Sequence, residues 1–416
     1  MKRLETDILI IGGGAAGMSA AVSASENSKL RVLVVDDNPR LGGQIWRPEL
    51  GKTKSPEAKK LIEKLAERRI EIVNNAQIFA QNNKASLLAE TQNGTIELGF
   101  EKLILAIGAR ERFLPFPNWT LPNVFGAGGL QALVKSGLSV QNKRIVVAGT
   151  GALLLAVAEY LKSKGAKVLL IAEQTSSAKL AKFGFGLIKQ PKKIAQAISL
   201  RTKLFGVRYL TGCYVVSAEG TDRLEAVNLT RNGRNQKIEC DLLASGFHLV
   251  PNIELASLLG CKIENGFVKV NNLQQTSVEN IFCAGEPTGI GGVELALIEG
   301  RIAGCAAVGE FEKAKELFTK RQSAQKFADA LNETFALREE LKGVPDAETI
   351  VCRCEDVRFE SLKNYHSWRE AKLQTRCGMG SCQGRVCGAA VEFLFDWKNE
   401  SVRPPIAPVK LENLAN

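Results

Sequence analysis

Two short apolar strands and a glycine-rich turn mark the front of this chain. Residues 7–12 form an apolar run that leads directly into Gly12-x-Gly14-x-x-Gly17, and a second apolar run follows at 32–35. Continuous apolar strands of this length are typical of a parallel sheet that is covered on both faces. Strand, glycine turn and helix in this order predict a dinucleotide-binding fold. In that fold Gly12 makes the tight turn, Gly14 lets backbone approach a pyrophosphate, and Gly17 lets helix pack on strand.

An acidic side chain follows the second of these strands, where the ribose hydroxyls of a dinucleotide are expected. Asp36 comes directly after the apolar residues and is therefore preferred to Asp37 as the ribose ligand. Ala15 and Ala16 open the helix after the turn, so their backbone lies where the phosphates are expected. The motif alone does not distinguish FAD from NAD.

The same pattern recurs near the middle of the chain. An apolar strand at 143–148 ends in Gly149-Thr-Gly151, and a second one at 168–172 ends in Glu173. A leucine stands at the third glycine position, and no basic residue follows Glu173 to bind a 2′-phosphate, so tight NADPH binding is not expected. NADH, another adenine nucleotide and an empty site all remain open for this second fold.

A charged segment precedes the end of the chain. From 310 to 342 its apolar residues lie mostly three and four positions apart, which predicts an amphipathic helix that packs on the rest of the protein. The sequence Gly343-Val-Pro345 then marks a break before a small last domain.

This last segment is rich in thiols. Five of the ten cysteines lie in it, at Cys352, Cys354, Cys377, Cys382 and Cys387. Clustered thiols in a chain of cytosolic character indicate metal or redox chemistry, and four thiolates are what a [2Fe–2S] cluster or a structural zinc needs. The other five cysteines are isolated from one another, and we predict that they are small core residues: Cys213, Cys240, Cys261, Cys283 and Cys305.

Composition and charge limit the number of domains and the kinds of partner that we expect. An apolar content of 45% in 416 residues describes two or three globular domains, and the net charge of +11 is unevenly spread. Between Glu173 and Glu219 there is no acidic residue, while eight lysines and arginines alternate with apolar residues. We interpret this segment as a solvated basic face, with a docking surface for an acidic partner or an anionic ligand as the alternative. Nucleic acid is not expected as a partner, because no recognition motif accompanies the charge. No apolar run is long enough to cross a bilayer and no export signal is recognised, so a cytoplasmic protein is expected.

Further stretches, at 39–44, 103–109 and 276–286, resemble the two-dinucleotide-binding-domain flavoproteins, the class that includes thioredoxin and glutathione reductases. In that family the last of these motifs holds the ribityl chain of FAD, and the inserted second fold is an NAD(P) domain. The resemblance implies FAD, and its expected ligands are Gly12, Gly14, Ala15, Ala16, Gly17, Asp36, Asp37, Gly43, Gln44, Ala106, Gly108, Gly285 and Glu286. Gly149, Gly151 and Glu173 are the corresponding expectation for NAD(H) or another adenine nucleotide in the second fold.

The thiol segment resembles the [2Fe–2S] module of the bacterioferritin-associated ferredoxin type. More narrowly, nearly the whole chain is similar to the α (A) subunit of heteromeric amino-acid dehydrogenases, namely opine oxidase, D-hydroxyproline dehydrogenase and proline dehydrogenase, with hydrogen cyanide synthase as a relative. The resemblance implies that Cys352, Cys354, Cys382 and Cys387 hold the cluster. Cys377 has the same spacing to Cys382 as Cys382 has to Cys387, so Cys377 in place of Cys387 stays open, as does a structural zinc in place of the cluster.

The expected fold class is α/β, with two nested dinucleotide-binding domains and a small α-rich [2Fe–2S] domain. The expected limits are an FAD-binding domain at 1–122 and 247–309, an inserted NAD(P)-like domain at 123–246, a helical bridge at 310–344, the cluster domain at 345–400 and a tail at 401–416.

The resemblance also implies a function. An oxidase-like β subunit of the glycine or D-amino-acid oxidase type would oxidise the amino acid, alone or with a small ferredoxin-like subunit, and this chain would carry its electrons to an unidentified acceptor. Membrane association would then arise only through that acceptor. No residue of this chain is assigned as a catalytic acid or base. The alternative is a stand-alone NADH-dependent flavoprotein reductase with a structural or redox metal tail.

Overall fold

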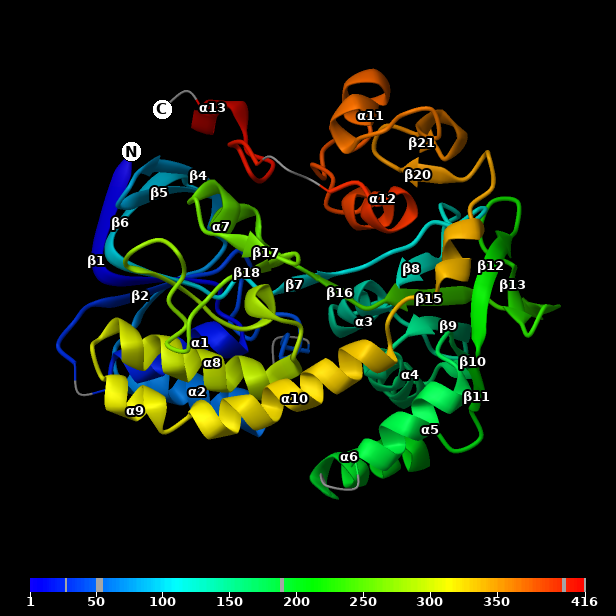
Figure 1. The fold of residues 1–416 in the computed structure, drawn as a ribbon, viewed down its shortest axis with the longest axis horizontal. Coiled ribbons are helices and arrows are strands. Elements are labelled where there is room, and N and C mark those ends of the chain that lie inside the picture. The colour runs from blue at the N-terminus through cyan, green and yellow to red at the C-terminus, as the bar shows by residue number, and fades with distance from the viewer. Residues whose placement is uncertain (27, 50–54, 188–190, 399–401, 415–416) are drawn as a thin grey trace. The chain divides into compact units, whose positions relative to one another are not determined.

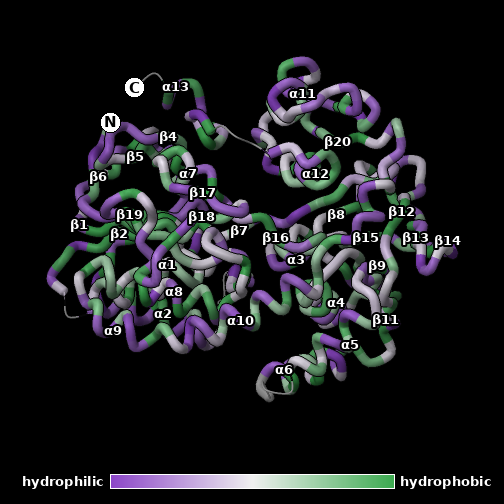
Figure 2. Tube along the Cα trace, in the orientation of Figure 1, coloured by the Kyte–Doolittle hydropathy of each residue, from purple (hydrophilic) through white to green (hydrophobic). Residues whose placement is uncertain are grey.

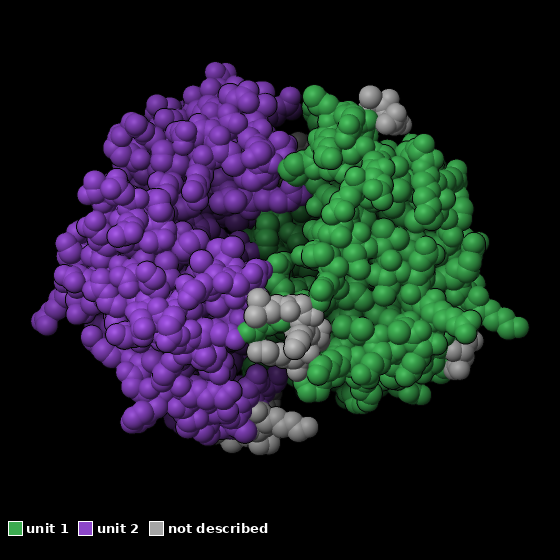
Figure 3. All heavy atoms as spheres, turned by 180° about the vertical axis from the view of Figure 1, so that it is seen from behind, with its two compact units in different colours: residues 1–110, 250–329, 401–416 green, residues 111–249, 330–400 purple. Residues whose placement is uncertain are grey.

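The computed structural model describes residues 1–26, 28–49, 55–187, 191–398 and 402–414 (Figure 1). Contacts within the chain divide it into two compact units (Figure 3). Unit 1 comprises Met1–Arg110, Val250–Asp329 and Ser401–Asn416, and unit 2 comprises Glu111–Leu249 and Ala330–Glu400. Each unit has its own sheet and its own hydrophobic core.

These boundaries differ from the expected domain limits. The first crossing lies at 110–111 instead of 122–123, because Phe113, Phe116 and Trp119 pack into the core of unit 2. The expected helical bridge is divided between the units and contains α9 (Phe311–Lys315), α10 (Phe318–Thr334) and the 3-10 helix η3 (Glu339–Gly343). Two short strands, β7 (Ala109–Glu111) and β16 (Leu249–Pro251), lie where the chain passes from one unit to the other.

Unit 1 is built on a seven-stranded sheet. Its order is β3 (Glu71–Val73), β2 (Val32–Val35), β1 (Lys2–Ile11), β6 (Gly94–Leu105), β5 (Ser86–Thr91) and β4 (Gln77–Asn83), and β19 (Ile281–Cys283) also pairs with β6. The strands β3, β2, β1, β6 and β19 are parallel, whereas β4, β5 and β6 form an antiparallel meander.

The second half of strand β1, from Ile8 to Ile11, is buried on both faces, as its apolar sequence predicts, whereas most residues of its charged first half are exposed. Ile8 and Ile10 pack against helices α1 (Ala15–Ala24) and α8 (Gly292–Ala307), and Leu9 and Ile11 pack on the side of the meander. Figure 2 shows the hydropathy of the residues along the chain. Helices α1 and α8 approach each other very closely, since a Cβ atom added at Gly300 would lie 2.1 Å from the carbonyl oxygen of Ala16. The remaining elements of this unit are α2 (Pro56–Glu67), α7 (Glu254–Leu258), β17 (Ile263–Glu264), β18 (Phe267–Val268), the 3-10 helix η2 (Glu286–Thr288) and α13 (Leu411–Leu414).

Unit 2 is also built on a sheet of parallel strands with helices packed on it. Its five-stranded parallel sheet has the order β11 (Arg208–Thr211), β10 (Lys167–Glu173), β9 (Arg144–Thr150), β15 (Leu242–Phe247) and β8 (Val124–Gly126). A three-stranded antiparallel sheet of β12 (Cys213–Glu219), β13 (Ala226–Arg231) and β14 (Arg234–Glu239) accompanies it. Its helices are α3 (Ala127–Lys135), α4 (Ala152–Ser163), α5 (Ser177–Gly186) and α6 (Pro191–Lys203).

The thiol segment forms a small α-rich part of unit 2. It contains a two-stranded ladder of β20 (Ile350–Cys352) and β21 (Val357–Arg358), the 3-10 helix η4 (Glu360–Leu362), and the helices α11 (Trp368–Thr375) and α12 (Cys387–Phe395). Val351, Leu362, Trp368 and Val391 form its core together with three of the cysteines.

The predicted class of fold, nested α/β domains of the dinucleotide-binding type followed by a small thiol-bearing part, is confirmed. The five isolated cysteines are all buried, as predicted for core residues. Among the described residues, no helix is both long and apolar enough to span a bilayer. The basic segment runs through α5, which has no buried residue, and α6; Lys189 lies outside the described residues.

Candidate flavin and thiol sites

The first glycine turn of unit 1 forms a cradle of backbone at the start of α1. Gly12 has a φ of +105°, and a Cβ atom there would lie 2.2 Å from the carbonyl oxygen of Ala106. At Gly17 a Cβ atom would lie 1.8 Å from the carbonyl oxygen of Gly12. Both positions therefore require glycine, for the reasons that the motif predicted.

The mouth of this cradle is open. A Cβ atom at Gly14 would meet nothing closer than the Cα of Gly43, at 3.9 Å, and Gly14 caps α1 without a side-chain hydrogen bond. The first-turn N–H groups of α1, beginning at Ala15 and Ala16, are thus available to a phosphate. Gly285, with a φ of +81°, lies on the same cradle, because its Cβ would be 3.0 Å from that of Ala16.

Asp36 fixes the shape of the turn. Its side chain is 5% exposed; Oδ2 accepts a hydrogen bond from the N–H of Gly13 at 2.5 Å, and Oδ1 accepts one from the N–H of Asn38 at 2.8 Å. Asp37, the other candidate acid, is exposed. The structure thus places Asp36 against the glycine turn, the position from which an acidic residue reaches a ribose.

The other expected flavin residues surround this turn. The N–H of Gly42 donates to the carbonyl oxygen of Gly13 at 2.9 Å, which places Gly43 beside Gly14, whereas Gln44 is exposed and accepts from Arg47 Nη2 at 3.0 Å. The N–H of Ala106 donates to Ile11 at 2.8 Å, and the carbonyl of Gly108, two residues on, accepts from the N–H of Asn252 at 3.0 Å.

Glu286 lies at the start of another helix. Its Oε1 accepts from the N–H of Gly292 at 3.0 Å and its Oε2 from that of Gly291 at 3.1 Å, so the carboxylate caps α8. Burial raises the pKa of Glu286 to about 7, although these two backbone donors act in the opposite direction.

Glu299 lies beneath this capped end and is 1% exposed. Its carboxylate accepts hydrogen bonds from the N–H of Gly285 and the hydroxyl of Thr288, and it pairs with Arg321 at 3.0 Å. A buried carboxylate is stable when it has partners of this kind. Glu299 therefore positions the Gly285–Glu286 turn, and the sequence motifs did not identify it because its partner Arg321 comes from a distant helix.

The second glycine turn, in unit 2, is built like the first, with open space at its second glycine, Gly151, and a buried acid, Glu173. Gly149 packs on Gly246, since a Cβ there would lie 1.8 Å from its carbonyl oxygen. Glu173 is 0% exposed; its Oε2 accepts from the N–H of Gly151 at 2.8 Å, and its Oε1 accepts from the Thr150 hydroxyl and the Thr175 N–H, each at 2.9 Å. Burial raises the pKa of this carboxyl, and its hydrogen bonds oppose the shift.

The four predicted cluster cysteines line one cavity in unit 2. Cys352 ends β20, Cys354 and Cys382 lie in turns, and Cys387 begins α12. The cavity measures about 320 Å³, and its full lining is Trp119, Cys352, Arg353, Cys354, Cys382, Val386 and Cys387. This donor set and this space fit a sulfur-ligated cluster or ion.

The fifth thiol lies behind this lining. The sulfur atoms of Cys352, Cys377 and Cys387 are all within 4.8 Å of one another and all three residues are buried. Hydrogen bonds from the thiols of Cys377 and Cys387 lower the pKa of Cys352, and the same contacts with Cys352 raise the pKa of Cys387. Cys377 is therefore close to the predicted ligands, but it is not part of the cavity lining.

Trp119 was not predicted as part of this site. It comes from the first segment of unit 2, its ring lies 4.6 Å from that of Phe113, and its Nε1 donates to the carbonyl oxygen of Ile350 at 2.6 Å, two residues before Cys352. Spacing could not find it, because 231 positions separate the donor from the acceptor.

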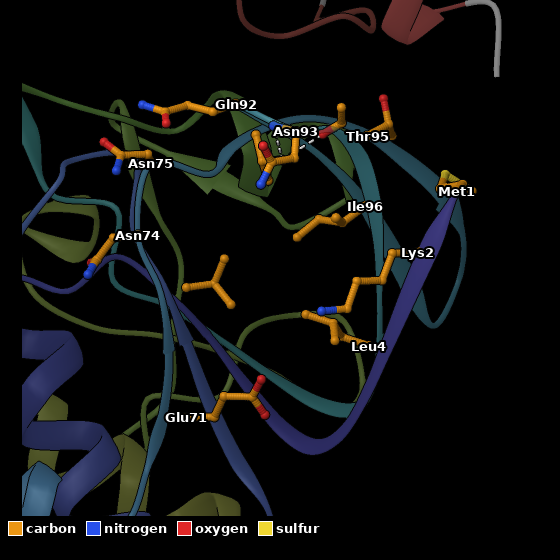
Figure 4. A pocket seen from close by; sticks show the side chains of 13 residues that line it. Met1, Lys2, Leu4, Glu71, Asn74, Asn75, Gln92, Asn93, Thr95 and Ile96 are labelled. Atoms are coloured by element: carbon orange, nitrogen blue, oxygen red, sulfur yellow. Dashed lines mark hydrogen bonds between the residues drawn. The ribbon is translucent and has the colours of Figure 1, made fainter.

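A larger hollow occurs on unit 1. It measures about 580 Å³ and is lined mainly by polar side chains, among them Asn74, Asn75, Gln92 and Asn93 (Figure 4). None of the expected flavin residues lines it, and it has no cysteine or histidine. The glycine cradle and the thiol cavity, the two candidate sites, thus share no lining residue with this hollow.

Comparison with known proteins identifies the family of the chain. Residues 6–302 match the family model described as pyridine nucleotide-disulphide oxidoreductase, and the chain belongs to this family of FAD-dependent oxidoreductases, in the group that contains the opine oxidases and hydrogen cyanide synthases. The predicted resemblance to the flavoprotein family and to this group of oxidases is thereby confirmed, whereas the [2Fe–2S] module at 345–400 stays a prediction.

Two sequence relatives and one solved structure illustrate these similarities. The opine oxidase A chain of Rhizobium meliloti is 30% identical over 98% of this chain and 87% of its own length. The HcnB chain of hydrogen cyanide synthase from Pseudomonas protegens is 29% identical, over 91% of this chain and 89% of its own. The crystal structure of L-proline dehydrogenase from P. horikoshii has the same fold, with a TM-score of 0.73 and 20% identity over 100% of this chain and 80% of that one.

Proposed function

We propose that this chain is the FAD- and [2Fe–2S]-carrying electron-transfer subunit of a heteromeric dehydrogenase that oxidises an amino acid of the opine, hydroxyproline or proline type. The observation that carries the proposal is the lining of one cavity by four cysteines, in a chain whose other unit offers a dinucleotide cradle. The relatives are named as subunits, which supports a function within a larger assembly.

The residues of unit 1 fit FAD. The open cradle at Gly14, the uncapped start of α1 and the buried Asp36 supply a phosphate site and a ribose acceptor. Gly285 and Glu286 would contact the ribityl chain, with Glu299 holding their turn. A bound flavin supplies chemistry that joins a two-electron donor to a one-electron carrier.

The residues of unit 2 fit a sulfur-ligated cluster. Cys352, Cys354, Cys382 and Cys387 would provide its four thiolates, two from the β20–β21 turn and two from the start of α12 and the turn before it. The buried thiol of Cys377 would stand behind Cys352 and Cys387 as a neighbour of the ligands.

The partner in this proposal is an oxidase-like flavin subunit that binds the substrate amine. We assign no acid or base for amine oxidation to this chain. The isolated chain should therefore contain both cofactors and show no turnover with any amino acid. Addition of the partner should produce substrate-dependent reduction of an artificial acceptor.

The test is reconstitution. The chain is purified anaerobically alone and together with a co-expressed oxidase-like partner, and each sample is assayed with proline, hydroxyproline and an opine. Turnover by the pair only supports the proposal, whereas turnover by the isolated chain refutes it. A stand-alone NADH reductase, the alternative, would instead bleach its flavin on addition of NADH without any partner.

A further inference from the structure

The second dinucleotide fold is covered by a segment of its own chain. We define the strap as residues 334–338 of unit 2, which are the last residue of α10 and the four residues after it. Its backbone carbonyls accept hydrogen bonds from the turn residues of the fold: the Thr150 hydroxyl donates to Phe335 at 3.3 Å and the Thr175 hydroxyl to Thr334 at 3.4 Å. The strap thus binds both the glycine turn and the end of β10.

Gln174 makes two side-chain hydrogen bonds to the strap. Its Nε2 donates to the carbonyl oxygen of Ala336 at 3.0 Å, and its Oε1 accepts from the N–H of Arg338 at 3.2 Å. The guanidinium of Arg338 also donates to the backbone carbonyl of Gln174 at 3.4 Å and stacks over Tyr214 at 5.7 Å. These contacts use both ends of a fully buried amide.

The covered residues are those that would bind an adenosine. In a dinucleotide fold the acid after the second strand binds the ribose, and the nucleotide passes over the residues beside it. Here Glu173 and Gln174 are 0% exposed, Thr150 is 1% exposed and Thr175 is 2% exposed. Both oxygens of the Glu173 carboxylate accept hydrogen bonds inside the fold, as both oxygens of Asp36 do in unit 1, so the difference lies in the burial of the residues beside the acid.

Unit 1 provides an internal comparison. The residue after its acid, Asp37, is exposed, whereas the corresponding Gln174 of unit 2 is fully buried. The second glycines of the two turns are alike, because a Cβ atom added at Gly14 or at Gly151 would meet no atom closer than 3.9 Å. The two folds share strand, turn and acid, so the strap is the feature that distinguishes them. We infer that the strap occupies the adenosine position of the second fold and closes it to NAD(H), NADP(H) and other adenine nucleotides.

This inference does not depend on the proposed function, but it agrees with it, because a chain closed to nicotinamide must receive its electrons from elsewhere. Substitutions that remove the hydrogen bonds of the strap should therefore give the second fold a measurable affinity for adenine nucleotides. Apparent affinity for a ligand scales with the fraction of the protein in the competent state, so the loss of two hydrogen bonds should raise that fraction by about tenfold or more.

The experiment measures binding of NADH and of ATP by equilibrium dialysis to the flavin-loaded chain. The wild type and the matched surface variant Lys237→Ala, in the same unit, should bind neither at about 1 mM, a typical limit for weak binding. Gln174→Ala and, as a milder second variant, Arg338→Ala should bind at least one of them measurably.

Stoichiometric binding of either nucleotide by the wild type would overturn the inference. The inference would also be overturned if Gln174→Ala and Arg338→Ala both folded, as judged by circular dichroism and flavin content, and neither bound NADH or ATP. The strap would then not be what closes the site.

Discussion

Replacing Trp119 with phenylalanine removes one hydrogen bond beside the thiol cavity and leaves most of the aromatic packing in place. The Nε1 of Trp119 donates to the carbonyl oxygen of Ile350 at 2.6 Å, and Ile350 belongs to the strand that carries Cys352. A hydrogen bond of this kind contributes about 1 kcal/mol net, so Trp119→Phe should destabilise the thiol part of unit 2 by that amount. The ring itself is only 6% exposed, and Trp119→Ala should cost about 3–5 kcal/mol.

Trp368 is a matched control. It is 7% exposed, similar to Trp119, but within the described part of the chain its Nε1 is buried without a hydrogen-bond partner. Trp368→Phe loses a comparable area of ring and no hydrogen bond. It should therefore cost less than Trp119→Phe, because removal of an unpaired buried donor relieves a desolvation penalty.

The assay follows loss of iron and unfolding in urea, with the visible absorbance of the thiol site as the local probe. We expect iron release to a chelator to be fastest in Trp119→Ala, intermediate in Trp119→Phe, and close to wild type in Trp368→Phe. Equal effects of Trp119→Phe and Trp368→Phe would refute the role of the Ile350 hydrogen bond.

Three further predictions concern single groups. Cys352→Ala should lose its iron and acid-labile sulfide while it retains flavin, because its thiolate lines the cavity in unit 2 and the cradle lies in unit 1; retention of full iron would show that Cys352 is not a ligand. Cys377→Ser should keep its iron, like the buried control Cys305→Ser, since Cys377 is absent from the cavity lining; loss of iron in the Cys377 variant alone would make it a ligand. The raised pKa of Glu286, about 7 against an ordinary 4.5, means that the folded flavin-free protein holds a proton that the unfolded chain releases. As the pH rises from about 4.5 to about 7, the free energy of unfolding should therefore fall by at most about 3 kcal/mol through this group. In urea titrations Glu286→Gln should reduce this dependence of stability on pH. An unchanged dependence in the variant would contradict the raised pKa of Glu286.

The first glycine turn could be predicted from sequence because its requirements are local. Gly12 and Gly17 have no space for a side chain, and Asp36 directly follows its strand, so motif and geometry coincide. The four cysteines of the thiol cavity could be predicted as a group for a similar reason, since all four lie within one short segment.

Other features depend on distant parts of the chain. Glu299 owes its role to Arg321, Trp119 reaches the thiol site from more than 200 positions away, and the strap reaches Gln174 from 162 positions away. The sequence around the second glycine turn also predicts a nucleotide site, because it has the same strand, glycine turn and acidic residue as the first. Only the fold shows that residues 334–338 form hydrogen bonds with Thr150, Gln174 and Thr175 beside it, which is the basis of the inferred closure.

The most direct test of the central claim is a single anaerobic preparation in which iron, zinc, acid-labile sulfide and flavin are counted and low-temperature EPR spectra are recorded before and after dithionite. The account predicts one flavin, about two irons and no zinc per chain, with a [2Fe–2S] signal that appears on reduction. A preparation with flavin and stoichiometric zinc, and without an EPR signal after reduction, would contradict it.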